Sequence, residues 1–262
     1  MKINNCKALI TGASAGIGRE FARQLASRAG SVVLVARRRE RLEQLRNELT
    51  KANPSLNVHV YDVDLADKTQ VDALIESLAH DKIDIDLLIN NAGLGDSGPF
   101  ATSDPTRIDQ IIQVNMSALT LLTRKLLPTM IARKRGAILN VSSSAGFLPI
   151  PGFAVYAATK AYVTNFSEAL RAELRDTGVS VSTLCPGQVH TEFGEVAKRP
   201  GGQPEAGPEF AYVPVEQVAR DGLAAVEADR PLVIPGFAMK LGMFLVRMTP
   251  MSILRRFSSK QR

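Results

Sequence analysis

Tyr156 and Lys160 stand four positions apart in the segment Tyr-Ala-Ala-Thr-Lys. On a helix, side chains with this spacing lie one above the other on one face. A phenol and an ammonium have ordinary pKa values of about 10 and about 10.4, so neither alone exchanges protons readily near neutral pH. A neighbouring ammonium lowers the pKa of a phenol. The pair could therefore give and take a proton, although the same spacing arises by chance where a surface cation covers a half-buried ring.

A second candidate site is the glycine-rich turn at residues 11–18, Thr-Gly-Ala-Ser-Ala-Gly-Ile-Gly. It follows an expected strand and opens an expected helix. Glycines let the backbone approach a phosphate, and the helix N-terminus supplies free N–H groups and a positive dipole. No Gly-Lys-Ser/Thr follows, which excludes a phosphate loop of the nucleotide-hydrolase type. A plain glycine turn is the alternative. The residues expected to contact a nucleotide here are Gly12, Ser14, Gly16, Ile17 and Gly18.

The composition is that of an ordinary globular protein, with 262 residues, 45% hydrophobic and 22% charged. No apolar run reaches the roughly 18 residues that span a bilayer, and the N-terminus lacks a signal-peptide core. Cys6 and Cys185 are far apart in sequence, which indicates buried thiols in a reducing compartment and favours the cytoplasm. The three histidines have no metal-ligand spacing, so we expect no metal.

The net charge is +6 and the isoelectric point is about 9.5. A basic chain suits nucleic acid, an anionic membrane or a polyphosphate ligand. No nucleic-acid motif is present and tryptophan is absent, so we expect no nucleic-acid partner. The basic residues concentrate at residues 37–39 and in the C-terminal segment, and the two places need separate explanations.

Short apolar runs alternate with longer amphipathic segments along the chain. Strands are expected at residues 7–10, 31–36, 57–61, 86–90, 136–141, 180–184 and 232–234. Helices are expected at residues 16–28, 38–52, 68–80, 105–133, 156–177 and 215–228. Apolar strands separated by helices predict an α/β fold with a Rossmann-type, doubly wound parallel sheet of about seven strands and helices on both faces. No linker or repeat divides the chain, so we expect one domain over residues 1–262.

Residues 194–214 differ from the rest because they contain four glycines and four prolines with little periodicity. Such a long loop in a compact domain is typically a functional lid or a disordered segment. We expect a substrate loop at about residues 189–214, with an inert surface excursion as the alternative.

The glycine turn and the Tyr-Lys pair together resemble the short-chain dehydrogenase/reductase family. Four further motifs carry the resemblance, in order and correctly spaced from residue 7 to residue 191. They are Asn90-Asn91-Ala92-Gly93, Asn115, Asn140-Val141-Ser142-Ser143-Ser144-Ala145-Gly146, and Pro186-Gly187 followed by Thr191.

The resemblance implies a role for four catalytic residues. Tyr156 would be the general acid in carbonyl reduction and the base in alcohol oxidation. Lys160 would lower the pKa of Tyr156 and bind the nicotinamide ribose. Ser143 would orient the substrate carbonyl and stabilise charge on its oxygen, with Ser142 and Ser144 left as strand-end hydrogen-bonding groups. Asn115 would bind a water that links Lys160 to solvent. The cofactor itself carries the hydride.

The end of the second expected strand indicates which cofactor is used. NAD-preferring proteins of this fold place an acid there, to bind the ribose hydroxyls. This chain has Arg37, Arg38 and Arg39 instead, and a guanidinium binds phosphate well. We therefore expect NADP(H), with Arg37 as the main ligand of the 2′-phosphate, Arg38 as a second and Ser14 as a further donor. A solvated helix start is the alternative.

The resemblance also implies further cofactor contacts. Asp62 and Val63 would hold the adenine. The remaining expected contacts with the cofactor are Asn90, Ala92, Gly93, Tyr156, Lys160, Pro186, Gly187, Val189 and Thr191.

Apolar residues close to the catalytic motifs predict a pocket for a hydrophobic ketone or aldehyde. The expected pocket residues are Leu94, Phe147, Phe153 and Phe193, with Leu148, Ile150 and His190 nearby. The same positions could instead be core that supports the loops.

The C-terminal segment, residues 236–262, combines apolar and basic residues and contains no acid. It suits an interface in a homodimer or homotetramer, or a lid. Peripheral contact with an anionic membrane is the second interpretation, and Pro250 should end any helix there.

Three functions are open at this point. The first is an NADP(H)-dependent carbonyl reductase or alcohol dehydrogenase. The second is a nucleotide-binding sensor on the same fold that has lost catalysis, which would be expected to lack the serine, tyrosine or lysine. The third is an epimerase or dehydratase of the extended relatives, which usually have a Gly-x-x-Gly-x-x-Gly turn that this chain lacks.

Overall fold

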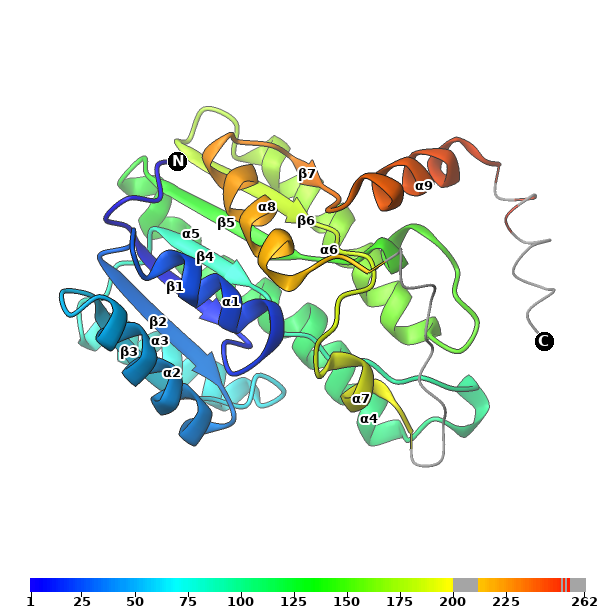
Figure 1. The fold of residues 1–262 in the computed structure, drawn as a ribbon, viewed down its shortest axis with the longest axis horizontal. Helices are drawn as coiled ribbons and strands as arrows, with labels where there is room; N and C mark the ends of the chain where they lie inside the picture. Colours follow the sequence, from blue (N-terminus) through cyan, green and yellow to red (C-terminus); the bar gives the residue numbers. More distant parts are fainter. Residues whose placement is uncertain (200–211, 251, 253, 255–262) are drawn as a thin grey trace.

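One parallel sheet organises the protein in the computed structural model, which describes residues 1–199, 212–250, 252 and 254. Its seven strands have the order β3-β2-β1-β4-β5-β6-β7 (Figure 1), and every neighbouring pair is parallel. The strands are β1 (Lys7–Thr11), β2 (Ser31–Ala36), β3 (Asn57–Asp62), β4 (Leu87–Asn90), β5 (Gly136–Val141), β6 (Val179–Leu184) and β7 (Leu232–Val233). The predicted fold class is confirmed.

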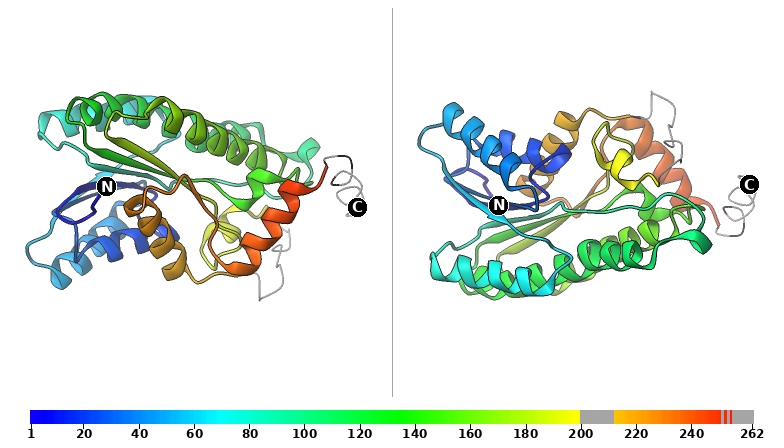
Figure 2. Two further views of the ribbon diagram at one scale, coloured as in Figure 1. Left: turned by 90° about the horizontal axis from the view of Figure 1, so that it is seen from above. Right: turned by 90° about the horizontal axis from the view of Figure 1, so that it is seen from below.

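Helices cover both faces of this sheet (Figure 2). The α-helices are α1 (Gly16–Leu25), α2 (Arg39–Ala52), α3 (Lys68–His80), α4 (Pro105–Ile112), α5 (Leu119–Ala132), α6 (Ala154–Glu173), α7 (Phe193–Ala197), α8 (Val215–Glu227) and α9 (Phe237–Met248). Shorter turns are η1 (Phe100–Thr102), η2 (Gln113–Ala118) and η3 (Ser144–Phe147).

Each strand contributes to two separate cores because successive side chains point to opposite faces of a sheet. In β1, Ala8 and Ile10 belong to the core that α1, α2 and α8 cover. Leu9, between them, belongs to the core under α3, α5 and α6. Both faces are therefore dry, and the strands appear in the sequence as continuous apolar runs.

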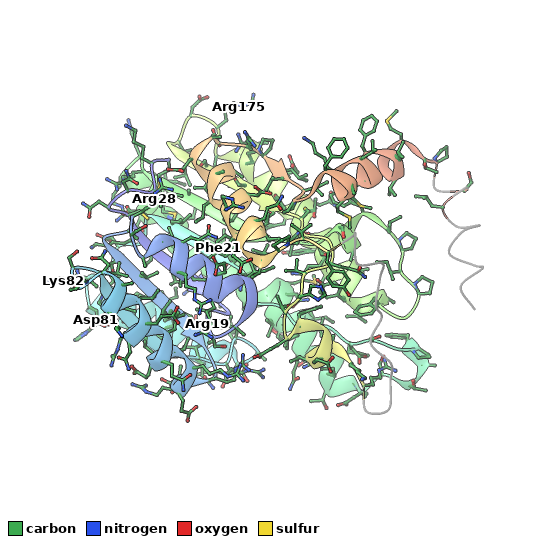
Figure 3. All side chains as sticks on the ribbon, in the orientation of Figure 1. Arg19, Phe21, Arg28, Asp81, Lys82 and Arg175 are labelled. Carbon is green, nitrogen blue, oxygen red and sulfur yellow. The ribbon has the colours of Figure 1, made fainter. Side chains whose placement is uncertain are left out.

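Close contact between α1 and α8 shows how tightly the first core is packed. Phe21 of α1 is fully buried, and a Cβ at Gly222 of α8 would lie 3.1 Å from its ring. Figure 3 labels Phe21 on α1 and Arg28 just beyond the end of that helix, where Arg28 pairs with Glu227 at 2.5 Å. Such exposed ion pairs stabilise little, so the packing of apolar groups such as Phe21 holds the two helices together.

A buried polar chain links the sheet to the second helix layer. Asn90 donates to Asn140 at 2.9 Å and to Thr123 at 3.1 Å. Asn140 donates in turn to Ser167 of α6 at 2.9 Å. Buried polar groups need such partners, and here the partners align β4, β5, α5 and α6. The side chain of Asn90 is thereby committed to the interior.

The helix expected over residues 105–133 is not a uniform α-helix. It consists of α4, a π-helical turn at η2 and α5. A π-turn inserts extra residues into a continuous helix and is frequent at functional sites. Apolar periodicity does not reveal it, because the helix continues on both sides. Asn115 lies within this turn.

The expected irregular loop contains ordered structure at its start. Helix α7 occupies residues 193–197, and isolated bridges join Ser97 to Lys198 and Gln188 to Tyr212. The prediction of an irregular segment was therefore wrong for α7. Residues 200–211 of the predicted loop lie outside the described residues.

The C-terminal helix α9 ends at Met248, two residues before Pro250, as expected. It exposes one apolar face, formed by Phe237, Leu241, Phe244, Leu245 and Met248. Residues 251, 253 and 255–262 of the expected apolar and basic segment lie outside the described residues. Within the described part of the chain, no helix has the length and hydrophobicity to cross a membrane.

Candidate functional site

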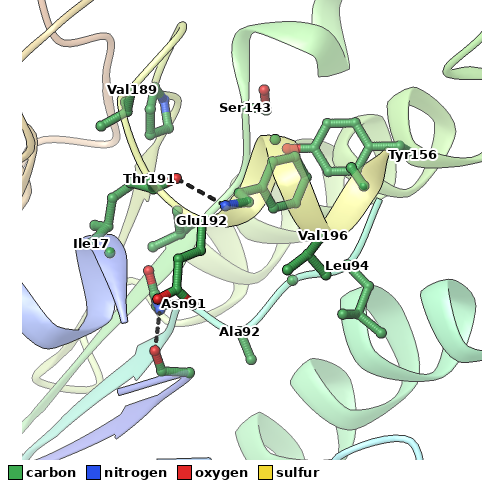
Figure 4. Close-up of a pocket in the computed structure, with 18 of the residues that line it drawn as sticks. Ile17, Asn91, Ala92, Leu94, Ser143, Tyr156, Val189, Thr191, Glu192 and Val196 are labelled. Carbon is green, nitrogen blue, oxygen red and sulfur yellow. Dashed lines mark hydrogen bonds between the residues drawn. The ribbon is translucent and has the colours of Figure 1, made fainter. Parts of the chain in front are cut away.

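A cavity of about 910 Å³ opens at the carboxyl ends of the strands. This is where doubly wound folds bind ligands, beside the point at which the strand order reverses between β1 and β4. Figure 4 shows its walls, which include Ile17 from α1, Ala92 after β4, Tyr156 from α6 and Thr191 after β6. The predicted site residues that line it are Gly12, Ser14, Gly16, Ile17, Arg37, Arg38, Val63, Ala92, Gly93, Leu94, Ser143, Leu148, Ile150, Phe153, Tyr156, Lys160, Pro186, Gly187, Val189, His190, Thr191 and Phe193.

Five predicted residues do not line the cavity. Two of these, Asn90 and Asn115, are buried in hydrogen-bond networks, and Phe147 lies in η3. A Cβ at Gly18 would lie 2.3 Å from the carbonyl oxygen of Gly12, so Gly18 permits close packing of α1 on the turn. The carboxylate of Asp62 points to Arg39, at 2.5 Å.

The structure therefore does not place Asp62 where its side chain was expected. Val63 lines the cavity, and so do Asp64 and Leu65, which follow it. The basic start of α2 captures the carboxylate of Asp62 because β3 pairs with β2 and brings the ends of both strands together. The sequence shows both residues, but not that the fold brings Arg39 to the carboxylate of Asp62.

The ends of β1 and β4 are tied together beneath the cavity. The hydroxyl of Thr11 accepts hydrogen bonds from the backbone N–H groups of Asn91 and Ala92, both at 3.0 Å. The amide of Asn91 donates back to the carbonyl of Thr11 at 2.9 Å. Gly12 follows with a φ of +68°, and a Cβ there would lie 2.9 Å from the Cα of Ala92. The turn therefore requires glycine at this position.

Tyr156 and Lys160 lie on the same face of α6, at the cavity wall. The Nζ atom of Lys160 is 5.7 Å from the centre of the Tyr156 ring and donates to the carbonyl of Val141 at 2.8 Å. Ser143, in the loop after β5, lies near Tyr156 at the cavity wall, where its hydroxyl accepts from the backbone N–H of Ala145 at 3.1 Å. The neighbouring Ser142 is instead buried and bonds to the carbonyl of Lys160 at 2.8 Å. A hydroxyl pair and an ammonium thus face one side of the cavity.

Burial governs the protonation of this cluster. It raises the pKa of Tyr156 to about 12, an effect that the nearby hydroxyl of Ser143 opposes. Burial also lowers the pKa of Lys160 to about 8, and Cys185 partly counters this. Loss of hydration disfavours the charged form of both groups. The expected lowering of the tyrosine pKa by Lys160 is therefore not seen, because the lysine points to Val141 and desolvation outweighs charge attraction.

Asn115 positions the loop after β4. Its Oδ1 accepts from the N–H of Leu94 at 2.8 Å, and its amide donates to the carbonyl of Leu94 and to Thr159 of α6, both at 3.0 Å. The π-turn directs this side chain between the two segments. Both amide hydrogens have protein partners, so the side chain holds Leu94 and α6 in place, and the water relay expected from Asn115 stays a prediction.

Gly93 leaves room in front of the lysine. A Cβ at this position would lie 3.4 Å from Nζ of Lys160 and 3.6 Å from Oδ1 of Asn115. The missing side chain opens a passage to the ammonium, so a ribose hydroxyl could reach it.

Aromatic rings surround Tyr156 on the substrate side. Phe193 is 5.2 Å from it and Phe153 is 5.9 Å from it, measured between ring centres. Met239 and Met243 of α9 also line the cavity. Sequence reasoning offered a lid for residues 236–262 but did not name either methionine as a site residue. It also did not name as site residues Asp64, Leu65, Asn91, Ser97, Val114 and Gln188, nor Glu192, Val196, Lys198 and Tyr212 of the expected substrate loop.

The described residues contain no group of three or more histidine, cysteine or acidic side chains that could hold a metal ion. Cys6 and Cys185 are buried free thiols. The groups at the tyrosine side of the cavity that could exchange protons are therefore the hydroxyls of Ser143 and Tyr156 and the ammonium of Lys160.

The family model for short chain dehydrogenases matches residues 7–200. The chain belongs to the short-chain dehydrogenase/reductase family. It is an oxidoreductase of that family. A sulfoacetaldehyde reductase from Chromohalobacter salexigens is 42% identical over 200 residues, which cover 75% of this chain and 77% of that protein.

Solved structures of the family share the whole fold. A short-chain dehydrogenase from Sphingobium yanoikuyae in complex with NADPH is 32% identical, with a TM-score of 0.82 over 94% of this chain and 95% of that one. A bulky-bulky ketone specific alcohol dehydrogenase from Comamonas testosteroni is 29% identical, with a TM-score of 0.78 over 95% and 94%. A Burkholderia phymatum structure in complex with NAD is 25% identical, with a TM-score of 0.80 over 94% of each chain.

The lowered pKa of Lys160 predicts a pH-dependent stability. Between pH 8 and 10.5 the unfolded chain keeps this lysine protonated while the folded protein releases the proton. The free energy of unfolding, compared with that of Lys160→Met, should then rise with pH by up to about 1.4 kcal/mol per pH unit. Urea unfolding at several pH values measures the difference. Lys51→Met, at an exposed position, controls for the loss of one lysine. A flat difference across the window would contradict the prediction.

Proposed function

We propose that this protein is an NADP(H)-dependent carbonyl reductase or alcohol dehydrogenase that acts on a hydrophobic ketone or aldehyde. One observation carries the proposal. Tyr156 lines the same cavity as the glycine turn, together with Ser143 and with Lys160, whose Nζ atom is 5.7 Å from the centre of the tyrosine ring. Proton transfer and nucleotide binding can therefore take place side by side.

The cavity fits a dinucleotide. Gly12, Gly16 and Gly93 leave its floor without side chains where a Cβ would meet neighbouring atoms, and the N-terminus of α1 points N–H groups at it. Gly12, Gly16 and Ile17 would hold the pyrophosphate, and Val63 with Asp64 and Leu65 would lie at the adenine. Pro186, Gly187, Val189 and Thr191 would hold the nicotinamide. When bound, the cofactor supplies or accepts the hydride.

The residues of this chain would handle the proton and the developing charge. Ser143 would donate a hydrogen bond to the substrate oxygen and orient its carbonyl. Tyr156 would donate its proton to that oxygen in reduction, and its raised pKa keeps it protonated at neutral pH. Lys160 would hold the nicotinamide ribose and bring positive charge to the tyrosine once its Nζ atom turns from Val141. In oxidation, the same proton would return to Tyr156.

We assign NADP(H) as the preferred cofactor because of the arginines after β2. Arg37 and Arg38 line the cavity, and no acid stands at the end of β2 to bind ribose hydroxyls. The NADPH complex from S. yanoikuyae supports the assignment, whereas the NAD complex from B. phymatum shows that the fold serves both cofactors.

The apolar lining supports a hydrophobic substrate. Leu148, Ile150 and Met243 line the cavity, and the rings of Phe153 and Phe193 lie beside Tyr156, so a bulky apolar group would lose water there. Likeness to the bulky ketone alcohol dehydrogenase agrees with this. The sulfoacetaldehyde reductase, named for a small anionic aldehyde, shows that relatives differ in substrate.

The catalytically silent sensor has no support. Such a protein would lack part of the proton-transfer cluster, but this chain has Ser143, Tyr156 and Lys160 at the cavity wall and Asn115 buried behind it, between Leu94 and Thr159.

We further propose that residues 1–262 form one catalytic unit that assembles as a homodimer or homotetramer in the cytoplasm. The exposed apolar face of α9 would be covered by a second copy, with contact to an anionic membrane as the second interpretation. Light scattering should give a multiple of the 28.3 kDa chain mass. A monomer that floats with acidic liposomes would reverse this order.

Tyr156→Phe should bind NADPH with unchanged affinity and reduce carbonyls at least about 10²-fold more slowly, because it removes only the acid. NADPH consumption over a panel of ketones and aldehydes of graded size measures activity, and titration measures binding. Tyr162→Phe is the matched control, since this tyrosine of α6 bonds to Thr120 and does not line the cavity. Equal activity of the two variants would refute the proposed acid, and no wild-type activity on any carbonyl would favour the sensor.

Arg37→Ala should lower kcat/KM for NADPH by about 10- to 100-fold and leave kcat/KM for NADH within about two-fold, because it removes one phosphate ligand. Arg46→Ala, in the α2 helix that follows Arg37 and paired with Glu43, controls for the lost charge. A wild-type preference for NADH would overturn the cofactor assignment.

A further inference from the structure

Glu192 reaches across the mouth of the cavity to two arginines of another segment. Its two carboxylate oxygens pair with Arg38 at 2.8 Å and with Arg41 at 2.5 Å. Glu192 belongs to the stretch that follows β6, next to Thr191, whereas the arginines stand at the start of α2. Figure 4 shows the side chain of Glu192 extending from this stretch into the cavity.

The contact of Glu192 with Arg38 is made where the 2′-phosphate of NADP(H) is expected to bind. Arg38 also donates to the hydroxyl of Ser14 in the glycine turn, with distances of 3.1 Å from Nη2 and 3.4 Å from Nε. Its guanidinium is thus held between Ser14 and Glu192. The neighbouring Arg37 lines the cavity, and the described residues provide no ion-pair partner for it.

We propose that Glu192 reduces the preference for NADP(H) over NAD(H). Its carboxylate occupies hydrogen-bond donors of Arg38 and Arg41 that the 2′-phosphate of NADP(H) must take over. The inference rests on the proposed NADP(H) site. The new element is the carboxylate of Glu192, which competes with the 2′-phosphate for the arginines. This residue was not among the site residues named from the sequence.

The competition follows from charge. A phosphate monoester has a charge of about −1.5 to −2 near neutral pH and three acceptor oxygens, so it binds a guanidinium more strongly than one carboxylate does. It must nevertheless displace Glu192 or lie beside it, and either cost weakens NADP(H) binding. NAD(H) has a hydroxyl at this position and needs no displacement. Glu192 therefore reduces the ratio of NADP(H) affinity to NAD(H) affinity.

The effect should be moderate because the three side chains are 41% to 47% exposed. Exposed ion pairs are screened by solvent and salt. Both arginines also lower the pKa of Glu192 through hydrogen bonds and charge, so the carboxylate stays ionised at neutral pH and competes there in full.

A different role for the same contact has the opposite consequence. If the Glu192 arm closed over the bound dinucleotide and retained it, losing the carboxylate would weaken NADPH and NADH alike. The two roles are distinguished by whether loss of the carboxylate strengthens or weakens dinucleotide binding, and by whether the change requires the 2′-phosphate.

The test compares Glu192→Gln with Glu40→Gln. Glu40 stands in the first turn of α2, is exposed, and forms no ion pair within the described chain, so its variant removes the same charge near the same arginines. Calorimetry would give Kd values of both variants and wild type for NADPH, NADH, 2′,5′-ADP and 5′-AMP. The last two differ only in the 2′-phosphate.

Glu192→Gln should tighten binding of NADPH and 2′,5′-ADP by about three- to ten-fold, and change NADH and 5′-AMP by less than about two-fold. Glu40→Gln should change all four by less than about two-fold. Thermal unfolding checks that the variants are folded.

Three results would overturn the inference: an unchanged ratio of NADPH to NADH affinity, weaker binding of both cofactors, or equal effects of the two variants. Wild-type protein that binds NADPH no better than NADH would contradict the proposed cofactor. The role of Glu192 is judged separately, by whether its variant gains affinity for 2′,5′-ADP.

Discussion

Thr11 joins the two halves of the sheet at the position on which the cavity depends. Its hydroxyl accepts from two successive backbone N–H groups after β4, and Asn91 returns a bond to its carbonyl. These bonds set the distance between the glycine turn after β1 and the loop after β4. Because β1 and β4 are neighbours whose helices leave toward opposite faces, a crevice must open between them. Gly12 and Gly18 then let the turn and α1 lie close to this junction.

The catalytic cluster depends on the same frame in a less direct way. Asn115 fixes Leu94, which directly follows the Asn-Asn-Ala-Gly segment, and at the same time holds Thr159 of α6. Thr159 stands beside Lys160, so the loop after β4 and the helix that carries the tyrosine are locked in register. The π-turn makes this contact from the middle of a long helical stretch. Lys160 is thereby held in a buried position, and its pKa is set mainly by the loss of hydration there.

Charge in this protein is arranged mainly around the two ends of the cavity. The tyrosine end holds few charges, with apolar and aromatic groups surrounding Tyr156. The opposite end holds Arg37, Arg38 and Arg41, of which two are already paired with Glu192. Such an arrangement suits a ligand with an anionic end and a reacting end of low polarity. Anion binding at this cationic end therefore has to compete with Glu192, which lies 154 positions after Arg38 in the chain.

The sequence by itself determined the sheet, the family and most of the residues around the cavity. Apolar strands that alternate with amphipathic helices have few stable arrangements, and the glycine turn and the Tyr-Lys spacing are local patterns. The tertiary structure alone decided which of these side chains meet. It turned Asp62 to Arg39 and Asn90 to Asn140, formed the π-turn at Asn115, and brought Glu192 to Arg38. These contacts join segments far apart in sequence, and burial reverses the pKa shift that spacing alone predicts for Tyr156, because desolvation depends on every group packed around it.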